Sequence, residues 1–419
     1  MKPLYVYADF DWLGNPTLVG ELGYESLRGS DSYSFRYDND WLHQYGNLFL
    51  SADINNYPGQ QYTQPGRDIF GCFSDALPDR WGRLLLNRRE QILAAEEKRP
   101  VRRLSSYDYL LGIDDFSRMG GFRFKEEPKG QFINCDNFLR IPPLTNIRSQ
   151  VSASMEIEKS EELNILPEKK WIQQLFHSGT SLGGARPKAS IQDTNGYLYV
   201  AKFPSRNDDY DVALWEHLSH LLAKEAGITA AETHIIEIGE RHHTLLSKRF
   251  DRTCEGKRVH FASAMTLLGL TDGCDAKSCN GYLDIVDFIL QSCCDVEYNL
   301  RQLYRRAAFN VAIGNSDDHF RNHGFLLTPK GWTFSPAYDM NPTLNEYQSL
   351  FITSSTNKAD LGLLLGASEE YMIGKEEAGE IIQEVKNAVS SWKSIAINIG
   401  VAKREIDLFG QIFNRVCSL

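Results

Sequence analysis

The chain has 419 residues, which is enough for two or three domain-sized units with a substantial hydrophobic core. Its content of 42% hydrophobic and 24% charged residues is ordinary for a soluble protein. The 55 acidic residues outnumber the 45 basic ones, and the resulting net charge of −10 disfavours unaided binding to the phosphate backbone of nucleic acids. Direct DNA recognition is therefore not expected, although a partner could bring the protein to DNA.

Cysteine spacing and the amino-terminal sequence bear on the compartment. The cysteines form no Cys-x-x-Cys pair and no histidine lies at zinc-finger spacing from them, which favours buried or free thiols in a reducing cytoplasm over a zinc site. Asp9 and Asp11 argue against a signal peptide, and no segment approaches 18 uninterrupted apolar residues. We expect a cytoplasmic protein.

The first predicted unit, residues 1–125, has a mixed α/β pattern. It contains short strands such as residues 4–7 and a basic amphipathic helix from Arg80 to about Glu97. A polar stretch at residues 125–130 closes this unit and is typical of a linker.

A loop of small residues and a strand follow. Residues 178–188 include three glycines, so their backbone could approach phosphate oxygens closely, although no Gly-Lys-Ser/Thr ends the run as in a Walker A motif. Residues 196–203 alternate like a strand that carries Lys202 near its end, the type of lysine that pairs with nucleotide phosphates. A flexible turn and a solvent-facing lysine are the alternatives.

A helix and two strands come next. Apolar residues at helical spacing predict a helix over residues 211–227, and Glu216 on it could orient Lys202 by an ion pair or could be an ordinary exposed helix acid. Strands are predicted at residues 234–238 and 244–250. A segment joining two lobes there could offer backbone groups to an adenine with Phe250 as an apolar wall, and a core phenylalanine is the competing interpretation.

The most informative stretch follows a predicted helix at residues 299–313. Asp317 is followed five residues later by Asn322, and Asp339 comes after a predicted hairpin of residues 323–328 and 331–334. Phosphoryl transfer needs a carboxylate that orients the attacking hydroxyl, and an amide oxygen and a second carboxylate that hold magnesium. The alternative is that Asp317, Asp318 and Asn322 cap helices or build a polar turn. Helical patterns, including residues 375–392, continue to the carboxy terminus.

Taken together, these segments resemble the HipA family of serine/threonine kinases, the toxins of bacterial type II toxin–antitoxin modules. The resemblance covers almost the whole chain and is most specific at residues 309–326 and 335–339, with further matches at 75–83 and 117–124. It implies an α+β, two-lobed protein-kinase-like fold with a β-rich N-lobe, an all-α C-lobe and an additional N-terminal α/β subdomain. The expected boundaries are 1–125 for the subdomain, 126–250 for the N-lobe with its phosphate loop and 251–419 for the C-lobe.

The resemblance also assigns roles to single residues. Asp317 corresponds to the catalytic aspartate, and Asn322 and Asp339 to the magnesium ligands. Ser181 falls on the autophosphorylated serine, whose modification ejects the phosphate-binding loop and switches the kinase off. The positions expected to contact the nucleotide are Gly183, Gly184, Ala185, Lys188, Lys202, Lys248, Arg249, Phe250, His319, Asn322, Tyr338 and Asp339. The sequence departs from familiar members at Gly184, Arg186, Pro187 and Lys248.

The function that the resemblance implies is an ATP- and Mg²⁺-dependent serine/threonine kinase acting as the toxin of a toxin–antitoxin module. Its expected partners are a HipB-like helix-turn-helix antitoxin that holds the kinase at its operator, and a protein substrate such as an aminoacyl-tRNA synthetase. A small-molecule kinase with the same phosphoryl-transfer site is the main alternative. A catalytically dead binding module is the third, although Lys202, Asp317, Asn322 and Asp339 are all present.

Overall fold

The computed structural model describes residues 2–27, 29–64, 67–135, 142–176, 184–239, 242–343 and 345–417. The chain divides into two compact units: unit 1 is Met1–Asn207 with Lys248–Ala262, and unit 2 is Asp208–Ser247 with Ser263–Leu419. This division splits the expected N-lobe segment, residues 126–250, between both units. The three expected segments remain a prediction as domain boundaries. Ser181 and Gly183 lie outside the described residues.

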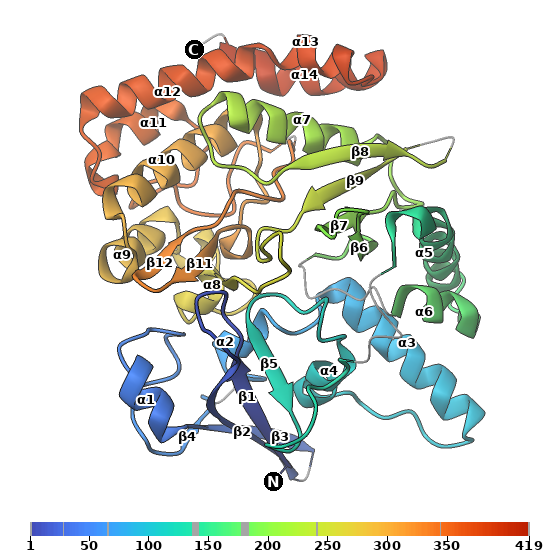
Figure 1. The fold of residues 1–419 in the computed structure, drawn as a ribbon. Helices are drawn as coiled ribbons and strands as arrows, with labels where there is room; N and C mark the ends of the chain where they lie inside the picture. Colours follow the sequence, from blue (N-terminus) through green and yellow to red (C-terminus); the bar gives the residue numbers. More distant parts are fainter. Residues whose placement is uncertain are drawn as a thin grey trace. The chain divides into compact units, whose positions relative to one another are not determined.

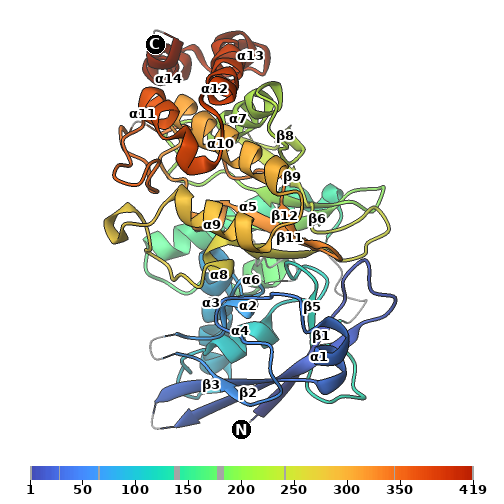
Figure 2. The ribbon, with the colours of Figure 1, turned by 90° about the vertical axis from the view of Figure 1, so that its left-hand side faces the viewer.

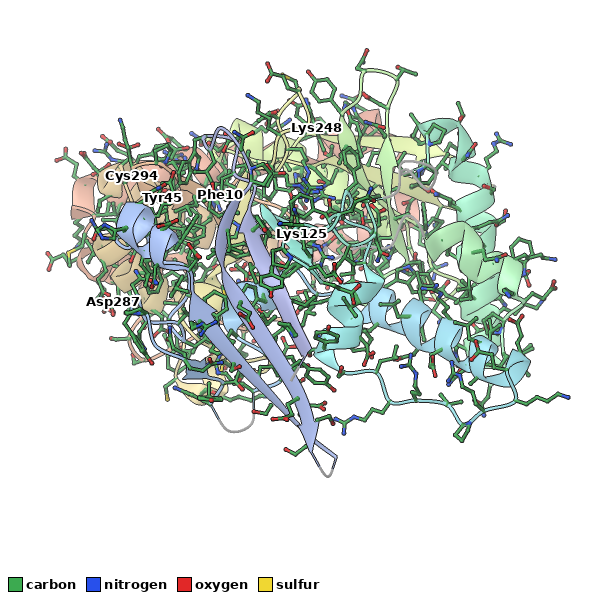
Figure 3. The ribbon with its side chains drawn as sticks, turned by 60° about the horizontal axis from the view of Figure 1, so that its bottom comes forward. Phe10, Tyr45, Lys125, Lys248, Asp287 and Cys294 are labelled. Carbon is green, nitrogen blue, oxygen red and sulfur yellow. The ribbon has the colours of Figure 1, made fainter. Side chains whose placement is uncertain are left out.

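Unit 1 begins with a five-stranded antiparallel sheet in the order β4-β3-β2-β1-β5 (Figure 1). Its strands are β1 (Lys2–Ala8), β2 (Thr17–Leu27), β3 (Ser30–Tyr37), β4 (Gln61–Tyr62) and β5 (Phe122–Lys125). Leu4, Val6 and Ala8 alternate along β1 and are each 0% exposed, so one face of the sheet supplies the core. Lys125 at the end of β5 places its ammonium 4.7 Å from the ring centroid of Tyr7 (Figure 3).

Helices complete the amino-terminal part of unit 1. They are α1 (Asn39–Tyr45), α2 (Gly71–Ser74), α3 (Arg80–Glu96), α4 (Ser106–Gly112), the 3₁₀ turn η2 (Leu144–Asn146), α5 (Ile147–Glu162) and α6 (Lys169–Phe176). The long helix expected from Arg80 is confirmed as α3. Its N-cap is Asp79, whose Oδ1 accepts a hydrogen bond from the backbone N–H of Gly82 at 2.6 Å.

A β-hairpin follows in unit 1. Its strands β6 (Lys188–Gln192) and β7 (Leu198–Lys202) are antiparallel, and Lys188 lies directly opposite Lys202. The strand expected to carry Lys202 near its end is therefore present. The short strand β10 (His260–Ser263) lies at the end of the second segment of unit 1.

Unit 2 is mostly helical, as the sequence predicts. Its helices are α7 (Val212–Glu225), α8 (Ala264–Leu267), η3 (Ala276–Ser278), α9 (Tyr282–Ser292), α10 (Val296–Ile313), η4 (Phe320–Asn322), α11 (Leu361–Gly366), η5 (Ser368–Tyr371), α12 (Lys375–Ser390), α13 (Trp392–Asn398) and α14 (Lys403–Cys417). Two hairpins accompany them, β8 (Thr233–Glu237) with β9 (His243–Lys248), and β11 (Gly324–Thr328) with β12 (Gly331–Phe334).

The core of unit 2 forms around α10, which packs against α9, α12 and α14 (Figure 2). Trp215 of α7 is fully buried, and its ring lies 4.3 Å from that of Phe409 on α14. Its indole N–H also donates to Glu405 at 2.8 Å, so the polar end of a large apolar side chain is satisfied. Among the described residues, no helix combines the length and the apolar character needed to cross a membrane.

Candidate active site

The loop that carries the predicted catalytic residues begins where α10 ends. Gly314 caps that helix with φ +68°, a left-handed conformation that favours glycine. A Cβ at this position would lie 2.7 Å from Cγ2 of Ile412 and 3.0 Å from the carbonyl oxygen of Thr343. The chain can therefore turn off α10 at this point only because the residue has no side chain.

A second segment fixes the start of this loop. The hydroxyl of Thr343 donates to the carbonyl oxygen of Gly314 at 2.7 Å and accepts from the backbone N–H of Ser316 at 3.2 Å. The backbone N–H of Ser349 donates to the carbonyl oxygen of Ser316 at 3.0 Å. These bonds determine the direction in which the next residue, Asp317, leaves the turn.

Asp317 and Asp318 have opposite environments. Asp317 is exposed, whereas Asp318 is 2% exposed, accepts a hydrogen bond from the Tyr282 hydroxyl and has its Oδ1 3.0 Å from Nε2 of His323. Burial alone would raise the pKa of Asp318, but the attraction of His323 and the hydrogen bond from Tyr282 hold it below its ordinary value. Asp318 therefore anchors the loop, and Asp317 faces the surroundings.

Asn322 lies at the far end of the loop, within η4. Its Nδ2 donates to the backbone oxygen of Asp317 at 3.0 Å, which fixes the orientation of the amide. Within the described part of the chain, no donor reaches its Oδ1. The amide oxygen is thus the end of Asn322 that a cation could use.

The β11–β12 hairpin is present as the sequence predicts, with Phe325 opposite Phe334. Directly beyond it, the Tyr338 hydroxyl donates to the backbone oxygen of Arg321 at 2.6 Å. Because Tyr338 precedes Asp339 and Arg321 precedes Asn322, this bond holds the two predicted metal ligands on neighbouring stretches of backbone.

Asp339 has an unusual backbone. Its φ of +58° lies in the left-handed region, which a residue other than glycine rarely adopts. The preceding stretch is fixed by hydrogen bonds from Ala337 N to Thr229 O at 2.8 Å and from Ala231 N to Ala337 O at 3.0 Å. Strained residues of this kind persist where the surroundings impose them, and they cluster at functional sites.

His319, the other residue predicted in this region, is the N-cap of η4. Its carbonyl oxygen accepts the backbone N–H of Asn322 at 2.8 Å, and its Nδ1 is a buried atom for which the described residues provide no hydrogen-bond partner. A buried ring nitrogen without a partner is available to a ligand. The predicted nucleotide contact of His319 stays a prediction.

In unit 1, Gly184 and Ala185 are exposed at the start of a described stretch, and Lys202 is partly exposed. Lys188 is buried at 2% exposure, and its ammonium lies 2.9 Å from Oδ2 of Asp79. This lysine therefore has a carboxylate partner within unit 1. Its predicted phosphate contact stays a prediction.

The expected partner of Lys202 lies in unit 2. Glu216 is 3% exposed on α7, with its carboxylate 4.0 Å from Nε2 of His220. The interpretation of Glu216 as an ordinary exposed helix acid is therefore wrong, because α7 packs this face into the core. An ion pair with Lys202 stays a prediction.

The three predicted hinge residues point in different directions. The Lys248 ammonium lies 4.0 Å from the ring centroid of Tyr197, and Phe250 contacts Phe261 with ring centroids 5.9 Å apart. Arg249 is buried, and its backbone N–H donates to the carbonyl oxygen of Leu198 at 2.8 Å. Contact between these residues and an adenine stays a prediction.

The Arg249 side chain belongs to a buried network. Its guanidinium bonds both oxygens of Asp251, at 2.8 and 2.7 Å, and donates to the carbonyl oxygens of Ser117 and Arg118 at 2.7 and 3.1 Å. Burial alone would raise the pKa of Asp251, but Arg249 and Arg252 outweigh burial and hold it well below its ordinary value. The Arg249 side chain thus fixes the hinge backbone to the 117–118 turn.

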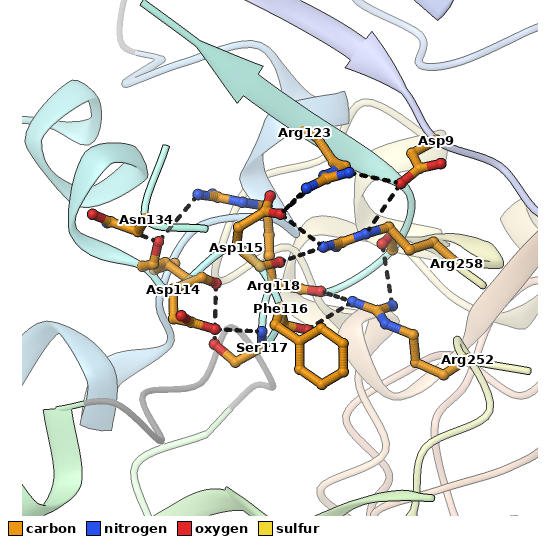
Figure 4. Close-up of polar contacts among 12 residues, drawn as sticks. Asp9, Asp114, Asp115, Phe116, Ser117, Arg118, Arg123, Asn134, Arg252 and Arg258 are labelled. Atoms are coloured by element: carbon orange, nitrogen blue, oxygen red, sulfur yellow. Dashed lines mark hydrogen bonds and ion pairs between the residues drawn. The ribbon is translucent and has the colours of Figure 1, made fainter. Parts of the chain in front are cut away.

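The network continues into the amino-terminal sheet (Figure 4). Asp115 lies 2.6 Å from Arg123 and 3.1 Å from Arg258, and Arg123 also reaches Asp9 at 3.2 Å. Arg252 donates to the carbonyl oxygen of Arg118 at 2.6 Å. The 117–124 segment that the sequence singled out is therefore a framework for the hinge residues.

A cavity of about 670 Å³ in unit 1 lies apart from these groups. It is lined by polar and charged side chains, among which the arginines are Arg67, Arg83, Arg102 and Arg103. None of the predicted site residues within the described ranges lines it.

Comparison with known protein families finds matches to two parts of the chain. The HipA-like C-terminal domain matches residues 180–392, and the HipA N-terminal domain matches residues 12–107. The first match alone spans about half of the chain. This chain belongs to the HipA family.

Two relatives are similar over long stretches. A putative kinase of Haemophilus influenzae is 25% identical over 234 residues, which cover 52% of this chain and 64% of that protein, slightly under two thirds of its length. The serine/threonine-protein kinase toxin HipA of Shewanella oneidensis is 25% identical over 350 residues, which cover 77% of this chain and 72% of that protein.

A solved structure shares the fold of this HipA-family chain. It is the complex of HipA, HipB and operator DNA from Shewanella oneidensis MR-1, which matches with a TM-score of 0.70 and 16% identity over 99% of this chain and 96% of that chain. The kinase-like α+β fold that the sequence predicted is confirmed.

Sequence reasoning missed two buried residues that hold the end of the β11–β12 hairpin. Arg306 of α10 is 3% exposed, donates to the carbonyl oxygen of Ser335 at 2.6 Å and lies 4.3 Å from the Phe334 ring centroid. Asn299 accepts the backbone N–H of Phe334 at 2.8 Å. The available signal was a set of polar positions within the predicted helix, since Gln302 and Asn310 of α10 are buried together with Arg306 and Asn299.

Proposed function

We propose that this HipA-family protein is an ATP- and Mg²⁺-dependent serine/threonine protein kinase that acts as the toxin of a toxin–antitoxin module. The observation that carries the proposal is the Tyr338–Arg321 hydrogen bond, which adjoins two residues whose side-chain oxygens could bind a metal, Asn322 and Asp339. Amide and carboxylate oxygens suit Mg²⁺, which takes its remaining ligands from phosphates and water. The Oδ1 of Asn322, which no donor among the described residues reaches, and the strained backbone of Asp339 both fit this role.

In this proposal Asp317 accepts a hydrogen bond from the substrate hydroxyl and aims it at the transferred phosphoryl group. Its exposure next to a buried anchor, Asp318, supports this role, because a protein substrate must reach it. Asn322 and Asp339 would hold Mg²⁺, which supplies neutralisation of phosphate charge. Lys202 contacts the phosphates, and the backbone of residues 248–250 faces the adenine.

The finer assignments come from the family resemblance. Ser181 is proposed as an autophosphorylation site that switches the kinase off. The proposed partner is a helix-turn-helix antitoxin, which would bring the protein to operator DNA, because the neighbouring solved complex contains HipA, HipB and operator DNA. The proposed substrate is a translation component such as an aminoacyl-tRNA synthetase.

The metal assignment is tested by Asn322→Ala and Asp339→Asn, with Asn387→Ala on the exposed face of α12 as the control. Loss of a ligand removes a transition-state interaction of several kcal/mol, so we expect ATP turnover to fall at least about a hundredfold and to require more Mg²⁺. The control should keep wild-type turnover. Near-normal turnover in either ligand variant, with an unchanged circular dichroism spectrum, would reject the assignment.

The toxin role is tested by growth. Expression of the wild-type chain without an antitoxin should arrest growth, and Asp317→Gln at the same protein level should not. Arrest that persists with Asp317→Gln would show that toxicity does not come from phosphoryl transfer.

A further inference from the structure

Two lysines face each other at the end of the β6–β7 hairpin. Lys188 and Lys202 are direct partners across the antiparallel pair, so their side chains leave the same face. Like charges directly opposite each other destabilise a strand pair. Asp79 offsets one of these charges, because its Oδ2 lies 2.9 Å from the Lys188 ammonium.

The Lys188 ammonium also lies close to Gly184, the first described residue of the proposed phosphate loop. Gly184 has φ +95°, and a Cβ built there would be 3.0 Å from Nζ of Lys188. The ammonium therefore lies within a few ångströms of the backbone that would face phosphate oxygens. Of the two partners, Lys188 is 2% exposed and Asp79 is 1% exposed, so little water screens their interaction.

Capping of α3 does not require a charge at position 79. Oδ1 of Asp79 accepts the Gly82 N–H, a task that asparagine or serine performs about equally well. The second oxygen is the one that meets Lys188. Buried ion pairs are often no more stabilising than apolar residues of similar size, so stability alone does not account for this carboxylate.

We propose that Asp79 is a resident counterion of Lys188 that repels nucleotide phosphates and thereby lowers the affinity of the Lys188 ammonium for a nucleoside triphosphate. This inference rests on the proposed function. Lys188 has three donors, so a phosphate oxygen can bond to it while Asp79 remains in place. The carboxylate then repels the phosphate, and neutralising it strengthens binding.

The test measures the Kd of a non-hydrolysable ATP analogue with Mg²⁺ by calorimetry for the full chain and four variants. Asp79→Asn keeps the cap and removes the charge, and we expect its Kd to be about tenfold lower than that of the wild type. Lys188→Met should raise the Kd about tenfold, and Asp79→Asn combined with Lys188→Met should return it toward the wild-type value, because the double variant removes the attraction and the repulsion together. Asp38→Asn, the same change at the N-cap of α1, is the control and should leave the Kd unchanged.

The outcomes separate this inference from the proposed function. No binding by folded wild-type protein would reject both. Binding by the wild type, with an unchanged or higher Kd for Asp79→Asn, would reject only the counterion role. If Asp79→Asn does not fold, Lys188→Met and the double variant decide. Lys188→Met must bind more weakly than the wild type, and a double variant that binds no more tightly than Lys188→Met would overturn the inference.

Discussion

At the scale of single residues, two adjacent aspartates differ in what they contribute: Asp318 to stability and Asp317 to the proposed activity. Asp318 is buried with His323 and Tyr282, so Asp318→Asn leaves a buried histidine without its charged partner. We expect this variant to lose about 3–5 kcal/mol of unfolding free energy. Asp317 is exposed, and Asp317→Asn should stay within about 0.5 kcal/mol of the wild type while it loses activity. Urea denaturation at pH 7 measures the unfolding free energy of both variants. Equal losses of stability in the two variants would contradict the assignment of Asp318 as the anchor of the loop.

His260 makes the free energy of unfolding depend on pH. Burial lowers its pKa from 6.5 to about 3, and its ring stacks on Phe10 with centroids 4.6 Å apart. Below about pH 6.5 the unfolded chain takes up a proton that the folded chain cannot. The contribution of His260 is therefore complete above pH 6.5 and is lost as the pH falls toward 3, by at most about 1.4 kcal/mol per pH unit.

We expect His260→Gln to be less stable than the wild type at pH 8 because it loses the stacking contact. Between pH 6.5 and 4.5, however, its unfolding free energy should fall less steeply. His217, whose pKa burial lowers to about 4, contributes equally to both proteins, so the difference between their slopes isolates His260. His43→Gln on the surface is the control, and equal slopes for the wild type and His260→Gln would refute the prediction.

Spacing in the sequence predicts which residues belong to the candidate site but says nothing of their environments. The spacing of Asp317, Asn322 and Asp339 was visible because it is local. Which aspartate is buried depends on Tyr282, 36 positions from Asp318, and the partner of Lys188 is Asp79, 109 positions away. Such pairings arise from tertiary packing, and local patterns do not encode them.

At the scale of elements, the end of α10 sets the position of the predicted catalytic loop. Gly314→Ala introduces a left-handed alanine that meets Ile412 and Thr343, and we expect a loss of about 1–3 kcal/mol of unfolding free energy together with lower turnover. Gly379→Ala within α12 is the matched control. No described atom outside that helix's own backbone approaches its Cβ within 4 Å, so this change should be neutral or stabilising by up to about 1 kcal/mol. Similar effects of the two substitutions would contradict the role of the α10 terminus.

Most elements near the site follow from periodicity. The hairpin over β11 and β12 was predicted from two apolar runs around a turn, and α7, α10 and α12 from apolar spacing, with ends that differ by up to a few residues. The signals were strong because each element places an apolar face in a core. The buried polar residues Arg306 and Asn299 were missed because helical spacing reveals a face without revealing what it contacts.

At the scale of the whole molecule, residues distant in sequence share one unit. The buried network brings the 248–252 segment onto the 115–124 segment, and Lys188 onto the start of α3. This explains why unit 1 includes both the amino-terminal sheet and the proposed phosphate loop. The predicted boundary at 125 followed a linker-like stretch and the one at 250 followed the change to helical patterns, and neither signal registers such long-range ion pairs.

Asp317 is proposed to direct phosphoryl transfer from ATP to a protein. The most direct measurement incubates purified protein with a cell extract and ATP labelled at its γ-phosphate, then separates proteins from metabolites. We predict Mg²⁺-dependent label on serine or threonine in the protein fraction, with none above background from Asp317→Asn. Label confined to metabolites, or equal protein labelling by Asp317→Asn, would contradict the account.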